Sequence, residues 1–154
     1  MDVRIVTFPE THVACFTHFG RPESEHDTVR KLLAWKLENR LLNSARHRHY
    51  GLHYTDSRAR KRDQHRVDFC LSVDKDDVEN SNDIEWKIIP RMKCAYARDV
   101  GSRLNNRAAA YLYAEWLPGS GEELSDYPII FHYVNVGPNV SDDEAITDVY
   151  MPLK

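Results

Sequence analysis

Residues 129–134 read IIFHYV and residues 50–55 read YGLHYT, so a His-Tyr pair recurs inside similar strand-like runs about 80 residues apart. In both places a short apolar run ending at a glycine and then a helical pattern precede the pair, and a second strand-like run follows it. The markers are Ala14, Gly20, Trp35, His53-Tyr54 and Asp68 in the first copy, and Ala95, Gly101, Trp116, His132-Tyr133 and Asp148 in the second. The chain therefore reads as two copies of a β-α-β-β unit.

A unit of this size buries little core alone, so the two copies are expected to pair about a pseudo-twofold axis. The predicted fold class is α+β, with an antiparallel sheet, helices on one face and a central ligand cleft along the seam. A single domain would span residues 1–154, with repeat 1 at about 1–75 and repeat 2 at about 84–154. The acidic segment from Asp74 to Asp83 lacks periodicity and is the expected linker.

The expected elements follow from strand-like runs, helical periodicity and turn residues. Strands are expected at 3–8, 12–19, 52–56, 67–73, 86–89, 94–100, 129–136 and 146–153. Ser24 or Asp27 should cap a first helix that buries Val29, Leu32, Leu33, Leu37 and Leu41. A second helix should run from about Asn105 to Leu117 and end at Pro118-Gly119.

Composition excludes several classes of protein. The net charge of −3 and the isoelectric point near 6.2 argue against direct nucleic-acid binding by this chain, which needs a basic face. There is no secretory signal at the start and no apolar run of membrane-spanning length, so a cytoplasmic protein is expected. Cys15, Cys70 and Cys94 lie singly in strand-like runs and should be reduced and buried.

Strand alternation sorts side chains onto two faces. Phe131, Tyr133 and Asn135 should share one face, and the matching strand is expected to add Leu52, Tyr54 and Asp56 to it. The last strand of each copy has an apolar face suited to packing under a helix: Phe69, Leu71 and Val73, and Val149, Met151 and Leu153. The other face carries Asp68, Cys70 and Ser72, and Asp148, Tyr150 and Pro152. Aromatic rings with a few carboxylates are typical of small-molecule pockets.

Eight residues are therefore predicted to line the cleft: Tyr54, Phe131, Tyr133, Tyr150, Trp35, Trp116, Asp68 and Asp148. Tyr54 and Tyr133 would form two walls of one slot, and the tryptophans would close its ends. Simpler alternatives stay open. The tyrosines could belong to a sheet surface that is partly exposed to solvent, and the tryptophans could pack at the edge of a helix. The two aspartates could act as acid and base, or make the same structural bond in each copy.

Other charged clusters favour no chemistry. The imidazoles in Arg46-His47-Arg48-His49 and His53 could suggest a metal site, but the arginines repel a cation and the stretch is expected to be an exposed loop. His53 and His132 should be core histidines, and the basic run Arg58 to Arg62 a solvated hairpin loop. No catalytic residue, metal site or cofactor is predicted.

Several stretches together resemble one family, the GyrI-like small-molecule-binding domain, which also forms the C-terminal effector-binding domain of AraC-type transcription regulators. They are PIIFHYVN (128–135), TDVYMPL (147–153), HFGRP (18–22), YGLHYTD (50–56), RVD (66–68) and AYLYAEWLP (110–118). The resemblance implies a two-lobed, SOUL-like fold whose cleft binds multiple drug-like ligands, often cationic and aromatic. It places Tyr54, Tyr133 and Tyr150 in the cleft. Phe131 stands where many members have a glutamate, which implies a shift toward neutral or aromatic ligands unless Asp68 or Asp148 supplies the charge.

The function expected from this resemblance is that of a sensor domain for a small aromatic or amphiphilic ligand in transcription regulation, and not that of an enzyme. The domain could stand alone or belong with a covalent or separate DNA-binding domain, and the start of the strand just after Asp2 favours excision from a longer regulator. A homodimer is an open alternative. The other functions considered are a protein-interaction module such as a gyrase inhibitor and, with Phe131 counting against it, a hydrolase of reactive ring compounds.

Overall fold

A computed structural model describes residues 1–54, 65–78 and 84–154 of the chain. Its strands are β1 (Arg4–Phe8), β2 (Thr11–Gly20), β3 (His49–His53), β4 (His65–Ser72), β5 (Glu85–Ile89), β6 (Met92–Val100), β7 (Ile129–Tyr133) and β8 (Ile146–Pro152). The helices are α1 (Glu25–Glu38), α2 (Arg107–Tyr111) and α3 (Leu117–Ser120), with a π-helical turn (Leu112–Trp116) between the last two. Short 3-10 turns cover Pro22–Ser24, Lys75–Asp77 and Asp142–Glu144. Among the described residues, no helix is both long and apolar enough to cross a membrane.

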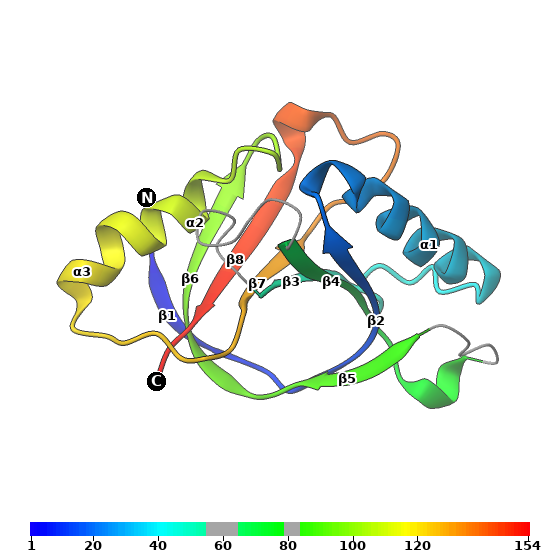
Figure 1. Ribbon diagram of the computed structural model, residues 1–154, viewed down its shortest axis with the longest axis horizontal. Helices are drawn as coiled ribbons and strands as arrows, with labels where there is room; N and C mark the ends of the chain where they lie inside the picture. Colours follow the sequence, from blue (N-terminus) through cyan, green and yellow to red (C-terminus); the bar gives the residue numbers. More distant parts are fainter. Residues whose placement is uncertain (55–64, 79–83) are drawn as a thin grey trace.

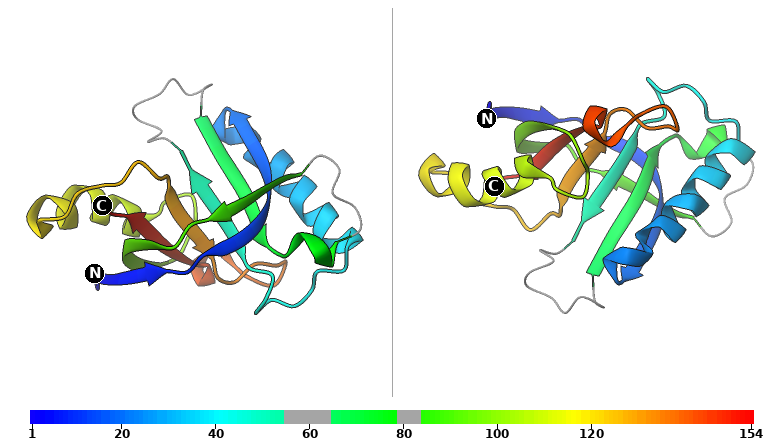
Figure 2. Two further views of the ribbon diagram at one scale, coloured as in Figure 1. Left: turned by 90° about the horizontal axis from the view of Figure 1, so that it is seen from below. Right: turned by 90° about the horizontal axis from the view of Figure 1, so that it is seen from above.

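The eight strands form one antiparallel sheet in the order β1-β6-β8-β7-β3-β4-β2-β5. Strands β1 to β4 of the first copy correspond to β5 to β8 of the second. When each strand is exchanged for its counterpart, the same order results, read from the opposite edge of the sheet. The pseudo-twofold axis therefore passes between β3 and β7. The sheet is curled, with α1 near one end of the molecule and α2 and α3 near the other (Figures 1 and 2). The predicted α+β class is confirmed.

The first strand of each predicted β-α-β-β unit is divided in two, with breaks where the strand-like runs of the sequence end, after residues 8 and 89. Pro9 and Pro90 interrupt the first extended run of each copy, because proline has no N–H to donate to a strand ladder. The interrupted strands cross to the other half: β1 pairs with β6, and β5 pairs with β2. After each crossing, Gly20 and Gly101 end equivalent strands with φ of 135° and 132°, a conformation that suits glycine.

The second helical segment continues past Pro118-Gly119, where the sequence predicts its end. Asn106 caps its start by accepting a hydrogen bond from the Ala109 amide at 3.0 Å. Pro118 lies in the first turn of α3, a position that needs no N–H, and the helix ends instead at Gly121 with a left-handed φ of 75°.

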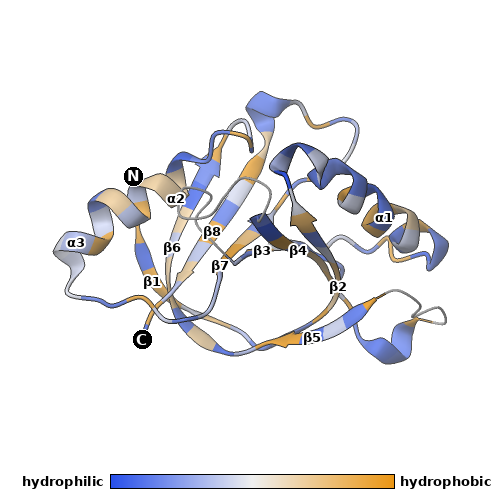
Figure 3. Ribbon diagram, in the orientation of Figure 1, coloured by the Kyte–Doolittle hydropathy of each residue, from blue (hydrophilic) through white to orange (hydrophobic). Residues whose placement is uncertain are grey.

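The core consists of apolar clusters on both faces of the sheet. One cluster lies under α1 and another under α2 and α3, and these contain the predicted apolar faces of β4 and β8. The third cluster lies on the opposite face, where the curled sheet closes around its own side chains; all three cysteines are buried in it and unpaired. Figure 3 shows hydrophobic residues mixed with hydrophilic ones along the strands. Since successive side chains point to opposite faces, a strand such as β4 that is buried along nearly its whole length contributes to both faces.

The register between the central strands corrects one face assignment. Gly51 lies directly opposite Phe131, and His49 lies opposite Tyr133, so these residues share a face. Leu52 is on the other face, where Tyr54 packs against the same cluster as Leu52. The hydrogen-bonded ladders make His53, and not Tyr54, the counterpart of Tyr133. The sequence match of the two His-Tyr pairs is therefore one residue out of structural register, and such a slip exchanges the faces.

Candidate ligand-binding site

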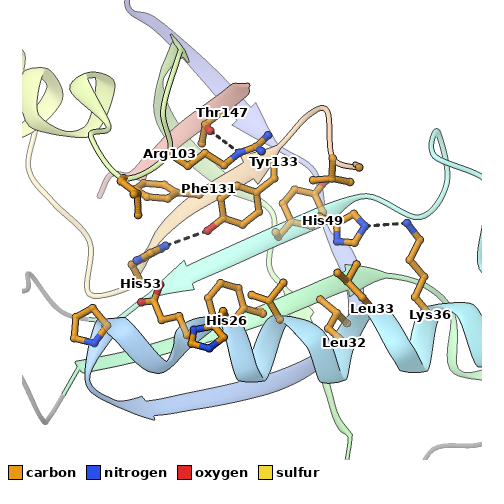
Figure 4. Close-up of a pocket in the computed structure, with 18 of the residues that line it drawn as sticks. His26, Leu32, Leu33, Lys36, His49, His53, Arg103, Phe131, Tyr133 and Thr147 are labelled. Carbon is orange, nitrogen blue, oxygen red and sulfur yellow. Dashed lines mark hydrogen bonds between the residues drawn. The ribbon is translucent and has the colours of Figure 1, made fainter. Parts of the chain in front are cut away.

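A cleft of about 990 Å³ lies between α1 and the centre of the sheet (Figure 4). One wall is the side of α1 that carries Val29, Leu33 and Leu37. The opposite side consists of β3 and β7 together with the loops that contain Arg103 and Pro138. Leu33 and Leu37 are 39% and 64% exposed, so these predicted core residues line the cleft instead of the core. An apolar cleft of this size with few polar groups suits a small organic ligand.

Tyr133 lies at the centre of the cleft because the strand beside it carries no side chain at Gly51. A Cβ atom at Gly51 would lie 2.5 Å from the Tyr133 hydroxyl oxygen and 3.1 Å from Cζ of the ring. The same hydroxyl is 3.4 Å from Nε2 of His53, whose ring lies 4.3 Å from that of Phe131 between centroids. Burial lowers the pKa of His53 to about 3 and raises that of Tyr133, so both side chains are neutral at pH 7.

Two cationic side chains, Lys36 and Arg103, lie beside His49 in the same cleft. Nζ of Lys36 is 3.0 Å from Nε2 of His49. Because an ammonium group can only donate, Nε2 accepts and Nδ1 of the neutral imidazole carries the proton. Burial, and next the charge of Lys36, lowers the pKa of His49 to about 4.

Neutral acceptors hold the Arg103 guanidinium in place. Its Nη2 donates to the backbone oxygens of Asn135 and Ile146 at 2.7 and 3.1 Å, and its Nε donates to the Thr147 hydroxyl at 3.3 Å. The guanidinium carbon lies 5.4 Å from the centroid of the Tyr133 ring. Arg103 therefore fixes the loop after β6 against β7 and β8 and forms part of the cleft.

The carboxylates of the cleft lie at its other end, near the start of α1. Glu25 accepts a hydrogen bond from Nε2 of the buried His65 at 2.7 Å, and its charge is favourable in the first turn of a helix. Glu23, in the preceding 3-10 turn, also lines the cleft. Within residues 1–54, 65–78 and 84–154, no group of three potential ligand side chains could hold a metal ion.

The buried, neutral His49 makes the stability of the fold depend on pH. Its pKa of about 4 in the folded chain lies below the usual 6.5, so the unfolded chain binds this proton more readily. Stability should therefore be highest above pH 6.5 and fall as the pH drops toward 4, by roughly 1.4 kcal/mol per unit of pKa difference. Denaturant unfolding of the wild type and of His49→Gln at several pH values checks this, because the variant should lose part of the slope. An unchanged slope would contradict the role of His49.

The family model of the GyrI-like small molecule binding domain matches residues 1–154. The chain belongs to this family. Among proteins of similar sequence, the "Probable transcriptional regulator YgiV" of Escherichia coli (strain K12) is 30% identical over 154 residues, which cover 99% of this chain and 96% of YgiV. The resemblance drawn from the sequence is confirmed.

Solved structures of other proteins share the fold. The C-terminal domain of EcmrR matches with a TM-score of 0.77 at 15% identity, covering 99% of this chain and 97% of the domain. The EcmrR chain in a complex with DNA matches with a TM-score of 0.78 at 16% identity, covering 99% of this chain and 57% of the EcmrR chain. This chain therefore spans little more than half of that protein. A hydrolase from Listeria innocua matches with a TM-score of 0.69 at 11% identity, covering 99% and 91% of the two chains.

The structure of this GyrI-like domain brings two of the eight predicted site residues, Phe131 and Tyr133, into the cleft. Tyr54 and Asp68 lie on the opposite face of the sheet. There the Tyr54 hydroxyl donates to Asp68 at 2.8 Å, and Lys87 and Thr17 donate to the same carboxylate at 2.5 and 2.6 Å. The predicted slot between Tyr54 and Tyr133 is therefore not formed, because the register places the two rings on different faces.

Tyr150 and Asp148 also lie on that opposite face. Tyr150 packs against Phe8 and Tyr96 with centroids 5.1 and 5.2 Å apart. Asp148 accepts hydrogen bonds from Arg98 at 2.7 and 3.0 Å and from the Tyr96 hydroxyl at 2.9 Å. Asp148 thus binds a cation of the neighbouring strand β6, and its counterpart Asp68 binds Lys87 of β5 across the intervening strand β2. Both contacts favour the structural alternative for the aspartates.

The two tryptophans pack into the clusters under their helices. Trp35 is 5% exposed and makes edge-to-face contacts with Phe16 and Trp86 at 6.2 and 6.3 Å between centroids. Trp116 packs against the cluster under α2 and α3. These positions match the alternative of packing at a helix and leave the ends of the cleft to other residues.

Four residues that were not predicted as site residues line this cleft: Lys36, His49, His53 and Arg103. Gly51, which lies against the Tyr133 ring, was not predicted either. His47 and His49 were expected in an exposed loop, yet both are buried, and β3 already begins at His49. The basic run Arg58 to Arg62 lies outside the described residues. One usable signal was the broad apolar stripe of α1, which is wider than the core beneath that helix requires.

Proposed function

We propose that this GyrI-like domain is a sensor in transcription regulation whose cleft binds a small aromatic or amphiphilic effector. The observation that carries the proposal is the apolar cleft of about 990 Å³ beside α1, in a member of a small-molecule-binding family. Rings from two strands and leucines from α1 supply contact area, and a few polar groups can orient the ligand. The relatives that carry the name of a regulator or bind DNA support a regulatory role.

Binding without turnover is part of this proposal. His53 and Tyr133 form the hydrogen-bonded pair at the cleft centre. The pKa of His53 lies far below 7, and that of Tyr133 lies far above it. A general acid or base works best when its pKa lies near the working pH, so this pair is poorly suited to proton transfer at pH 7. The apolar Phe131 beside them offers no nucleophile. The similar Listeria innocua hydrolase supports the fold alone, since only 11% of its residues are identical.

The proposal includes a DNA-binding partner, either joined to this domain or separate from it. A net charge of −3 is unfavourable for binding a phosphate backbone, so the contact with DNA is assigned to another chain or segment. A cytoplasmic location follows from such a role. The domain would then change the activity of its partner when the effector occupies the cleft.

Filling the cleft should abolish effector binding. In a thermal-shift screen of the purified chain against cationic, neutral and anionic aromatic compounds, ligands that bind the folded state raise the melting temperature. For compounds that do so, Leu33→Trp should remove the shift, because the indole occupies the space between α1 and β7. Leu42→Trp is the matched control, since Leu42 is an exposed leucine just beyond α1 that does not line the cleft.

The proposal fails if no compound raises the melting temperature of the wild type, or if the hits bind Leu33→Trp as well as they bind the control variant. Isothermal titration calorimetry on the two variants measures the difference directly. Release of a product from a bound compound would contradict the assignment as a sensor without turnover.

A further inference from the structure

The charges that line the cleft are separated along its length. Glu25 and Lys36 both belong to α1 and are eleven residues apart, which corresponds to about 16 Å along the helix axis. Glu23 lies beside the acidic end, and Arg103 lies over the Tyr133 ring, across His49 from Lys36. Between the two ends the cleft is lined mainly by apolar groups, so a bound molecule meets opposite charges at opposite ends.

The cationic end lacks a counter-charge in the part of the chain that the structure describes. No carboxylate there lies within ion-pair distance of Lys36 or Arg103; the charge of Asp142 acts on Arg103 only from farther away. Other half-buried cations of the sheet are paired, as Arg98 is with Asp148 and Lys87 with Asp68. Burial lowers the pKa of both Lys36 and Arg103, which reflects the cost of holding these charges away from water.

The two cations also keep unused hydrogen-bond donors. Among the described residues, Nε and Nη2 of Arg103 have acceptors, whereas Nη1 has none. Lys36 gives one hydrogen bond, to His49, and its ammonium group has two further N–H bonds. His49 cannot compensate either charge because it is neutral.

Both cations flank one point of the sheet. Lys36 contacts His49, whose partner across the ladder is Tyr133, and the guanidinium of Arg103 lies over the Tyr133 ring. Figure 4 shows Arg103 and Lys36 on either side of Tyr133 and His49 in the same cleft. An anionic group at this point would gain charge-assisted hydrogen bonds beside two partly buried cations.

We propose that Lys36 and Arg103 form a subsite for the carboxylate of an aromatic acid whose apolar body fills the cleft. The proposal rests on the function proposed above and adds the class of ligand. A carboxylate oxygen can accept from the free Nη1 of Arg103, and the single charge of the group fits a cleft whose far end already carries Glu23 and Glu25. The ring system would lie between Leu33 of α1 and Phe131 of β7.

Three probes of one shape and different charge test the subsite: 2-naphthylacetate, its methyl ester and 2-(2-naphthyl)ethylammonium. Calorimetric titration of the wild type should show the acid binding at least about tenfold more tightly than the ester, and the amine more weakly still. Lys36→Met should remove most of that preference, and Lys36→Glu should reverse it in favour of the amine. Lys93→Met is the control, because Lys93 pairs with Glu122 outside the cleft.

The preference for the acid should also fall as salt is added, since it depends on charge. Equal binding of the three probes, or tighter binding of the amine to the wild type, overturns the carboxylate subsite and leaves the sensor function standing. Failure of all three to bind also overturns the subsite; the sensor function falls only if the wider compound screen is silent as well. An acid preference that survives in Lys36→Glu removes Lys36 from the site.

Discussion

Replacing Asp68 by alanine should destabilise the fold by about 3 kcal/mol and leave effector affinity unchanged in the folded fraction. Asp68 is completely buried and accepts hydrogen bonds from Thr17, Tyr54 and Lys87. The alanine variant leaves two hydroxyls and one ammonium without their acceptor on a half-buried face. These donors and the Lys87 amine keep the pKa of Asp68 low despite its burial, so the lost group is a carboxylate.

Denaturant unfolding measures the loss, and Asp77→Ala is the control. Asp77 pairs with the exposed Arg46, and exposed pairs contribute little, so the control should lose less than about 1 kcal/mol. Asp68→Asn keeps the shape of the side chain and provides a folded variant for titration if the alanine variant is too unstable. A loss of affinity in Asp68→Asn would return Asp68 to the ligand site. A loss of stability no larger than that of Asp77→Ala would contradict the network.

The second large effect is expected at the contact between Gly51 and Tyr133. Gly51→Ala should weaken effector binding at least about tenfold, because the new methyl group displaces the Tyr133 ring into the cleft. Tyr133→Ala should weaken binding by a similar factor through loss of the ring itself. The double variant tests whether one contact explains both effects, since neighbouring substitutions are then not additive.

In the double variant, the stability cost of Gly51→Ala should largely vanish because the ring that it meets is gone. Stability is followed by thermal unfolding and affinity by calorimetry with a hit from the screen. Gly119→Ala is the control, since a Cβ there would meet no atom within 4 Å. Additive effects of the two substitutions would show that Gly51 acts on the cleft by some route other than Tyr133.

The fold class, the apolar faces of the last strands and two cleft residues could be predicted from the sequence. These features follow from local periodicity and from a repeat, and such local patterns can be recognised in a single sequence. Phe131 and Tyr133 were expected to share a face because they alternate along a single strand, and both line the cleft; that they bind a ligand stays a prediction. The family, too, is carried by local stretches of sequence.

The pairing between strands could not be predicted in the same way. The match between the two His-Tyr pairs is persuasive in the sequence, but the ladders set His53 opposite Ile129 and make it the counterpart of Tyr133. Register depends on contacts between segments far apart in the chain, and an error of one residue moves every side chain to the other face. The match of the two pairs placed Tyr54 on the face of Tyr133, as the resemblance to the family did.

The two cations were missed for a different reason. Lys36 is a polar residue on a helix, and a sequence pattern divides a helix into a buried and an exposed side. The cleft creates a third environment at the border of the two, next to His49. Arg103 follows the turn at Gly101, and nothing in its neighbours indicates that the loop returns to β7 and β8.

The crossing of β1 and β5 couples the two halves mechanically. Each half contributes its first strand to the outer edge of the other, so neither β2 nor β6 has a partner on that side within its own copy. A displacement of α1 by a ligand would act on β2 and β4, and through β2 on a strand that leads directly into β6. The duplicated halves are therefore expected to respond together, so that a ligand bound in the cleft beside α1 would affect both ends of the sheet.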